Sequence, residues 1–197
     1  MTTETAPPSA RQAELLEAGY RYALEHGLAD LSLRPLATAI GSSPRVLLYL
    51  FGSKDGLVRA LLTRARMDEL EMLAQLRRRG ADRQVGLTVV AERVWSWLAA
   101  DEHRALLTLW VEAYARSLVD PDGPWADFAR DTVEDWLAVL AAAQPAAVRV
   151  TDAGLAERTL VLAVLRGCLL DLLATGNAER VTAAVAEHLA AGFRHLK

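Results

Sequence analysis

The 197-residue sequence contains a single cysteine, Cys168, so no disulfide can form within the chain. Low cysteine usage is typical of proteins from a reducing compartment. Aromatic residues make up only 6% of the chain, and no uninterrupted apolar run is long enough to cross a bilayer. The first residues lack the basic and then apolar pattern of an export signal, and we expect residues 1–8 to form a disordered arm. These absences predict a cytoplasmic protein that does not associate with membranes.

The sequence also lacks the short motifs of the common enzyme classes. It contains no Gly-x-Ser-x-Gly, no phosphate-binding glycine-rich loop and no His-Glu-x-x-His. Its four histidines are scattered and suggest no metal site. We therefore expect no catalytic residue, no metal and no cofactor, and an all-α enzyme is retained only as an alternative.

Acidic residues are missing from one internal stretch, residues 31–54, which contains Arg34, Arg45 and Lys54. The whole chain has a net charge of −3, so this stretch is a local basic region in a mildly acidic protein. Contacts to phosphates supply most of the non-specific affinity of proteins for DNA. The stretch therefore favours DNA binding, with a helical hairpin whose basic face is merely solvated as the alternative.

Three helix start signals fall in the same region. Ser32, Ser43 and Ser53 are good N-caps, and a glycine follows each of the first two helices that they begin. Pro44 suits the first position of the second helix, where its missing N–H costs nothing. Two short helices joined by a tight turn form a helix-turn-helix, whose second helix lies in the DNA major groove. The region therefore predicts a DNA-binding unit.

A longer helix is predicted before this pair, over residues 9–26, and Gly27 follows it. At this point the chain resembles the DNA-binding domain of the TetR family of bacterial transcriptional regulators. The resemblance covers residues 9–60 and rests on Ala18, Ala23, Gly27, Leu31, residues 36–40, Gly41, Ser43, Phe51, Ser53, Lys54 and Leu57. It implies an all-α protein with a helix-turn-helix DNA-binding domain at 9–56 and a helical effector-binding and dimerisation domain at 57–197.

The presumed recognition helix departs from the family pattern. The family commonly has a threonine and two tyrosines where this chain has Val46, Leu48 and Leu50, so the usual phosphate-binding hydroxyls are missing. We expect Val46, Leu47 and Leu50 on the inner face. Tyr49 is the candidate replacement, unless it packs against its own domain, and Arg45 can fork onto a guanine or bind a phosphate. The expected DNA-binding residues are Arg34, Ser42, Ser43, Pro44, Arg45, Tyr49 and Lys54.

Beyond residue 57 the sequence shows no strand-like alternation. The helices that we expect there cover about 53–79, 83–100, 101–119, 124–143 and 151–175, with a loop at 144–151 and a last helix after Asn177. Residues 160–174 are apolar almost all round, yet too short and too charged to span a bilayer. Such a helix must be buried in protein.

The last two helices are expected to form a homodimer by closing a four-helix bundle with their twofold copies. TetR-family proteins dimerise in this way, and we expect Leu189 in the interface. The alternative is that the apolar surface of these helices packs into the core of a single chain.

The large aromatic residues of the C-terminal part fall on its middle helices. The resemblance implies a ligand pocket there, and such pockets are lined by aromatic and aliphatic side chains with a few polar groups. A plain core is the alternative for each aromatic residue. Thr108 and Gln144 are further candidates for the polar groups. The ligand-binding residues that we expect are Trp95, Trp97, Trp110, Glu112, Tyr114, Trp125, Phe128, Trp136 and Arg166.

Together these patterns predict a homodimeric transcriptional regulator that binds a pseudo-palindromic, double-stranded operator. The resemblance implies a repressor that a small, largely apolar effector releases from DNA. A helical ligand-binding or scaffold dimer with weak or lost DNA binding is the alternative, because the recognition helix lacks the usual hydroxyls.

Overall fold

The computed structural model describes residues 9–28, 31–81 and 86–192, and the described chain is helical without a strand. The predicted arm at 1–8 and the first residues of the helix predicted from 83 lie outside the described residues. The elements are α1 Ala10–His26, α2 Leu33–Ala39, α3 Pro44–Phe51, α4 Lys54–Ala81, α5 Leu87–Leu98, the 3-10 turn η1 Asp101–His103, α6 Arg104–Val119, α7 Phe128–Ala142, α8 Ala146–Arg149, α9 Asp152–Thr175 and α10 Ala178–Gly192.

The predicted helix starts of the helix-turn-helix are present. The Ser43 hydroxyl accepts a hydrogen bond from the Val46 N–H at 3.3 Å, and the Ser53 hydroxyl accepts one from the Gly56 N–H at 2.9 Å. Ser32 holds the N-cap position of α2, but its side chain makes no capping hydrogen bond. The prediction for Ser32 was therefore right about the position and wrong about the contact.

Two predicted boundaries in the C-terminal part were wrong. The helix expected from residue 124 begins only at Phe128, because Asp127 has a φ of 66°, a left-handed conformation that an α-helix cannot include. The loop expected at 144–151 contains the short helix α8. Thr151 then caps α9 by accepting a hydrogen bond from the Gly154 N–H.

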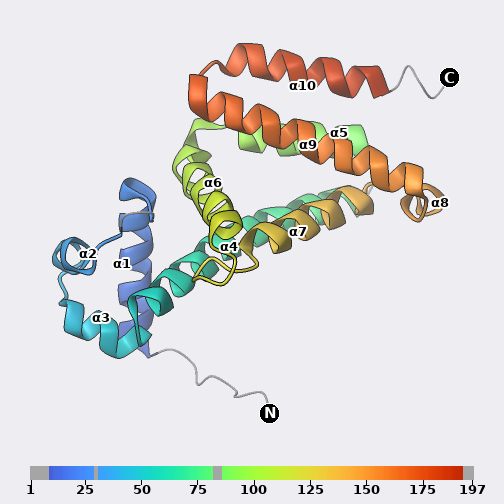
Figure 1. Cartoon of the computed structure of the whole chain (residues 1–197). Coiled ribbons are helices and arrows are strands. Elements are labelled where there is room, and N and C mark those ends of the chain that lie inside the picture. The colour runs from blue at the N-terminus through green and yellow to red at the C-terminus, as the bar shows by residue number, and fades with distance from the viewer. Residues whose placement is uncertain (1–8, 29–30, 82–85, 193–197) are drawn as a thin grey trace.

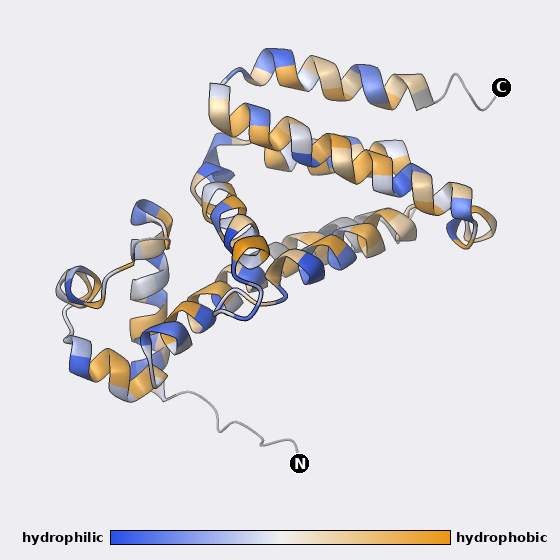
Figure 2. Ribbon diagram, in the orientation of Figure 1, coloured by the Kyte–Doolittle hydropathy of each residue, from blue (hydrophilic) through white to orange (hydrophobic). Residues whose placement is uncertain are grey.

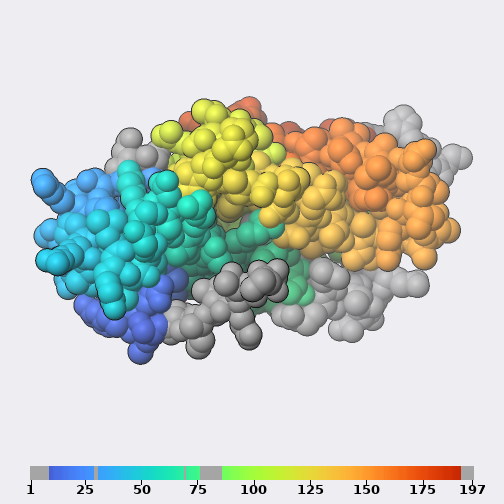
Figure 3. Space-filling view, turned by 60° about the horizontal axis from the view of Figure 1, so that its bottom comes forward, coloured from blue at the N-terminus to red at the C-terminus, as the bar shows by residue number. Residues whose placement is uncertain are grey.

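The helix-turn-helix unit lies at one end of the molecule, and α9 and α10 run side by side at the other (Figure 1). The long helix α4 leads from α3 toward the C-terminal part and packs against α7. Figure 3 shows the same order on the surface, from α1–α3 at one end to α8 and α9 at the other. The candidate DNA-reading helix and the last two helices are therefore separated by the middle helices. Among the described helices, none is long and apolar enough to cross a membrane.

The buried side chains form two core clusters. The first joins α1–α3 to the first half of α4, as far as Ala65, and also contains Leu109 and Ala113 of α6 together with Trp125 and Phe128. The second joins the end of α4 to α5, α7, α9 and α10. Trp110 of α6 packs against both clusters. The helix-turn-helix unit is thus packed directly onto α6 and the start of α7.

The outer surface of α9 carries an apolar stripe that its own chain does not cover. Leu189 of α10, expected in the dimer interface, is buried with Val181 and Val185 in the second core cluster. Leu189 therefore belongs to the core of the single chain, and the prediction for it was wrong. The residues of the α9 stripe are Ala156, Leu160, Ala163, Gly167, Leu170 and Ala174, all exposed and spaced by three or four positions. Such spacing places them along one side of the helix.

Candidate nucleic-acid interface and ligand cavity

Helix α3 exposes a face that combines apolar side chains with an arginine and a tyrosine. Leu47 is buried, and Leu50 and Phe51 are half-buried where α3 packs on α4. At 100° per residue, the opposite face carries Arg45 and Tyr49 at its centre. Figure 2 shows hydrophobic residues along most of α3, and the exposed ones are Val46 at 39%, Leu48 at 40% and Tyr49 at 85%.

Val46 was expected on the inner face of α3, and that prediction was wrong. Leu47, which was also expected there, does point into the core, and the packing of α3 on α4 leaves Val46 39% exposed. Tyr49 does not pack against its own domain, since most of its side chain is in contact with solvent. The hydroxyl of Tyr49 is thus open to solvent.

The three cations of the acid-free stretch are all exposed on the helix-turn-helix unit or at the start of α4. Arg34 lies on α2, Arg45 on α3 and Lys54 at the first position of α4. Among the described residues, no carboxylate forms an ion pair with any of the three. Their charges are therefore available to phosphates.

The hydroxyls at the turn before α3 are less available. The Oγ atom of Ser42 is buried and has no hydrogen-bond partner, and the Oγ atom of Ser43 is occupied by the N-cap of α3. Pro44 is half-buried. The structure therefore leaves Arg34, Arg45, Tyr49 and Lys54 as the expected DNA-binding side chains that solvent reaches most freely.

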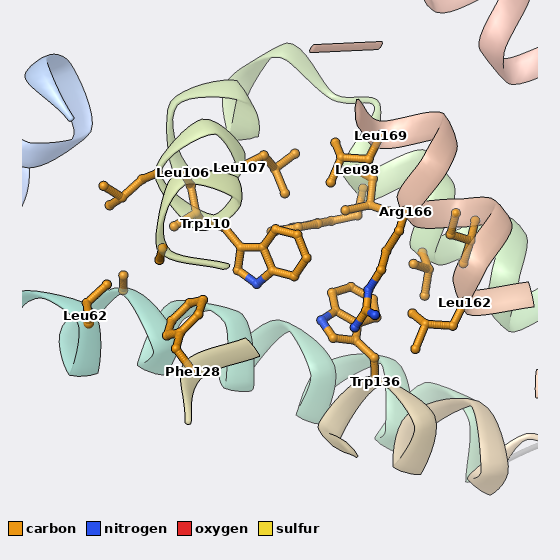
Figure 4. Close-up of a pocket in the computed structure, with 16 residues that line it drawn as sticks. Leu62, Leu98, Leu106, Leu107, Trp110, Phe128, Trp136, Leu162, Arg166 and Leu169 are labelled. Carbon is orange, nitrogen blue, oxygen red and sulfur yellow. The ribbon is translucent and has the colours of Figure 1, made fainter. Parts of the chain in front are cut away.

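A cavity lies between α4, α5, α6, α7 and α9 (Figure 4). Its free volume is about 30 Å³. That is well below the roughly 300–1,000 Å³ of pockets that bind drug-sized ligands. The lining residues are Leu62, Ala65, Val94, Trp97, Leu98, Leu106, Leu107, Leu109, Trp110, Ala113, Phe128, Trp136, Leu162, Leu165, Arg166 and Leu169.

The cavity gathers five of the expected ligand-binding residues, namely Trp97, Trp110, Phe128, Trp136 and Arg166. The other four are not among its lining residues. Trp95 donates its indole N–H to Thr182 of α10 at 3.0 Å, and Trp125 is buried in the first core cluster. Tyr114 lies just beyond the cavity, where its hydroxyl accepts a 3.4 Å hydrogen bond from Arg166. Glu112 contacts the backbone of Leu28 instead.

Arg166 is the one charged side chain among the described residues that line the cavity. Its guanidinium carbon lies 5.2 Å from the ring centre of Tyr114 and 6.0 Å from that of Trp110. Figure 4 shows the guanidinium extending from α9 toward Trp136. Cations are attracted to aromatic faces at such distances, so this side chain is held in an otherwise apolar lining.

Glu112 links α6 to the helix-turn-helix unit. Its Oε2 atom accepts a hydrogen bond from the backbone N–H of Leu28 at 2.9 Å, just after α1. Gly27 permits this approach, because it has a φ of 77° and because a Cβ atom there would lie only 3.1 Å from Glu112 Oε2. Glu112 is therefore a contact between the two parts of the chain. The helix that carries it also carries Trp110 of the cavity.

Sequence reasoning missed further links between α1 and α4. Tyr20 donates its hydroxyl to Asp68 Oδ2 at 2.9 Å, and Arg64 pairs with both Glu17 and Asp68. Burial, and next the hydrogen bond to Asp68, raises the pKa of Tyr20 well above its ordinary value, so the hydroxyl remains a donor. Because these partners are far apart in the sequence, no local sequence pattern predicts the contacts between them.

The remaining polar candidates lie away from the cavity. Thr108 is exposed and donates to the Arg104 carbonyl, while Gln144 is buried and donates to the Gly154 carbonyl and to Glu157. The aliphatic lining was missed, because a leucine beside a cavity has the same sequence signature as a leucine in a core. Among the described residues, no group of three or more His, Cys, Asp or Glu side chains is placed to hold a metal ion.

Comparisons with known proteins agree with this geometry. The family model described as "Bacterial regulatory proteins, tetR family" matches residues 15–61, which span the helix-turn-helix unit. No curated protein sequence matches the chain significantly.

Solved structures share the fold over nearly the whole chain. A TetR transcription regulator from Haloarcula marismortui is 19% identical, with a TM-score of 0.69 over 92% of this chain and 97% of that one. A transcriptional regulator from Rhodococcus sp. Rha1 is 19% identical, with a TM-score of 0.73 over 91% and 94%. The multidrug binding protein EbrR, solved with ethidium, is 25% identical, with a TM-score of 0.65 over 90% and 97%.

Proposed function

Since residues 15–61 form an N-terminal domain of the TetR family and the whole chain has the fold of its regulators, we propose a ligand-responsive repressor that acts as a homodimer. The observation that carries this proposal is the exposed face of α3, with Arg45 and Tyr49 at its centre, together with the exposed cations Arg34 of α2 and Lys54 of α4. Major-groove recognition by a helix-turn-helix needs such a face, with cations free to meet phosphates. A regulator of this kind acts in the cytoplasm, where bacterial DNA lies.

The α9 stripe is the surface that we assign to the dimer. Leu160 and Leu170 are 56% and 51% exposed in the single chain, on the side of α9 opposite its buried residues. Gly167 lies between them in the helix, and a Cβ atom there would meet nothing within 4 Å. An interior glycine destabilises a helix by about 1 kcal/mol relative to alanine, but its lack of a side chain lets a second helix approach the backbone closely. Two copies of α9, with α10 beside each, would then form a four-helix interface.

The cavity between α4, α5, α6, α7 and α9 is the site that we assign to the effector. Its lining favours a small, largely apolar molecule, and Arg166 favours one with an acceptor or acidic group at one end. EbrR was solved with ethidium, a cation, and the guanidinium of Arg166 disfavours a ligand of that charge here. Because the cavity has only about 30 Å³ of free volume, an effector can enter only if lining side chains such as Trp110 and Phe128 move.

Helix α6 is the element through which we expect the effector to act on DNA binding. Leu106, Trp110 and other residues of α6 line the cavity, and Glu112 holds the Leu28 N–H of the helix-turn-helix unit. A helix is stiff over this distance, so a displacement at Trp110 is transmitted to Glu112, two residues away. An effector that binds best to the displaced state would move the paired reading helices out of register with adjacent major grooves.

Gel-shift titrations test this function. The full-length protein is expected to retard a duplex from the region upstream of its own gene. A panel of small aromatic compounds, neutral, anionic and cationic, is then screened by intrinsic tryptophan fluorescence. A compound that changes the fluorescence should release the operator over the same concentration range, and operator should weaken its binding by the same factor, about 5- to 150-fold. Trp110→Ala should raise the effector concentration needed and leave effector-free operator affinity nearly unchanged.

Two results would count against this function. If no duplex is bound with sequence preference, the scaffold-dimer alternative is favoured. If every compound that changes the fluorescence leaves operator affinity untouched, the cavity is not part of a switch.

Replacing Glu112 tests the proposed path through α6. We expect Glu112→Ala to leave effector binding, followed by fluorescence, nearly intact, because Glu112 does not line the cavity. The factor by which effector weakens operator binding should fall by about tenfold, because a hydrogen bond to a charged acceptor contributes about 1.5–3 kcal/mol. Glu112→Gln keeps an acceptor oxygen and should retain more of the coupling. Full coupling in Glu112→Ala, in a protein with an unchanged melting temperature, would rule out this contact as the path.

A further inference from the structure

The exposed face of α3 combines apolar side chains with cations in a way that the proposed function does not yet explain. Val46 and Leu48 are branched, apolar and about 40% exposed, on either side of Arg45 and Tyr49. Single exposed apolar side chains are common on protein surfaces, whereas these two lie on one short helix that also carries an exposed arginine and tyrosine. Their place on the candidate reading face suggests that they are covered when the protein acts.

The surroundings of the two side chains point to DNA as what covers them. Arg34, Arg45 and Lys54 are exposed around α3, and none forms an ion pair with a described carboxylate. A protein partner would have to supply an apolar groove rimmed with acids, whereas a DNA duplex supplies phosphates on both sides of a groove wide enough for a helix. Charge complementarity therefore favours the major groove as the occupant.

The major groove offers one apolar group on its base edges, the C5-methyl group of thymine. Guanine, adenine and cytosine have no methyl group there, and neither Val46 nor Leu48 can form hydrogen bonds to their polar groups. We propose that Val46 and Leu48 read thymine methyl groups, so that each operator half-site carries thymines within the few base pairs that α3 spans. This inference rests on the proposed function and adds the base class that the reading helix selects.

The substitution of deoxyuridine for thymidine tests the inference directly, because deoxyuridine pairs identically and lacks only the methyl group. An operator is first obtained by selection from random duplexes with the full-length protein. Each thymidine is then replaced singly by deoxyuridine, and the Kd is measured by fluorescence anisotropy at fixed salt. Replacement at a contacted position should weaken binding by about fourfold, the equivalent of one methyl group no longer buried. Replacement elsewhere should have no effect.

Variants of the two side chains complete the test. Val46→Ala and Leu48→Ala should each weaken binding to the thymidine operator and abolish the deoxyuridine effect at its own positions. Most of each side chain is buried, so each variant should lose some stability, and the deoxyuridine effect is measured at a temperature at which circular dichroism shows it folded. Val119→Ala, which removes an exposed valine at the end of α6, is the matched control and should retain the full deoxyuridine effect.

The outcomes separate this inference from the function on which it rests. If the selected operator is bound equally well with deoxyuridine throughout, or if the deoxyuridine effect survives in both alanine variants, the inference is overturned and the regulator stands. If selection yields no preferred sequence at all, the inference and the DNA-binding function are both overturned.

Discussion

Leu160→Glu is expected to convert the dimer to a folded monomer. The change places a carboxylate in the α9 stripe, and the dimer would bury that charge in each protomer without an ion-pair partner. We expect the dimer to be weakened by on the order of 4 kcal/mol, about a thousandfold in its dissociation constant. Light scattering should report the monomer mass, while circular dichroism should report a helical protein. Operator affinity should fall when the dimer is lost, because a monomer has one reading helix and binds one half-site alone.

Two further variants make the dimer test specific. Val119→Glu also replaces an exposed apolar residue, 79% exposed at the end of α6, and should remain dimeric. Leu189→Glu places the same charge in the core of the single chain and should reduce the melting temperature or prevent folding. If Leu160→Glu remains dimeric at micromolar concentration, the interface lies on another face of the molecule.

Arg45→Ala is expected to weaken operator binding by about 5- to 150-fold, corresponding to about 1–3 kcal/mol for a base-specific contact. Arg45 is exposed at the centre of the reading face, and no carboxylate among the described residues competes for its guanidinium. If Arg45 binds a guanine, the variant should lose preference at one base pair in each half-site. If it binds a phosphate, binding should weaken equally on all sequences and the salt slope should fall by about one.

Matched variants test whether the effect of Arg45→Ala is specific to the exposed face of α3. Arg116→Ala removes an exposed arginine from the last turn of α6 and should leave operator binding unchanged. Lys54→Ala should lower the salt slope by about one, and Tyr49→Phe should show whether the exposed hydroxyl contacts the DNA backbone. Unchanged operator affinity in all three of Arg45→Ala, Tyr49→Phe and Lys54→Ala would place the reading surface elsewhere.

The local sequence of residues 9–60 was enough to predict the helix-turn-helix. Caps such as Ser43 and the glycines after the short helices act over one turn, so their effects are encoded within a few residues. The same reasoning predicted Val46 on the wrong side of α3. The rotation of so short a helix depends on which side chain fits against α4, and that contact joins residues distant in sequence.

Assigning apolar residues to a core, a cavity or an interface needed the tertiary structure. Leu160 and Leu189 have the same side chain on neighbouring helices, yet one is 56% exposed and the other is buried. Likewise, Trp95 is a core residue that donates a hydrogen bond to Thr182, whereas Trp110 lines the cavity. Hydrophobic periodicity reports that a side chain must leave water, but not what it packs against.

The contact between Glu112 and Leu28 shows the same division between sequence and structure. The sequence by itself determined the all-helical chain, the helix-turn-helix and the exposed cations around it, because helix caps, periodicity and local charge are short-range properties. Only the tertiary structure decided that Glu112 bonds to the helix-turn-helix unit and that Arg166 lines the cavity. These contacts join segments far apart in the chain, and they form only when the packing of the whole molecule has set the relative positions of α1, α6 and α9.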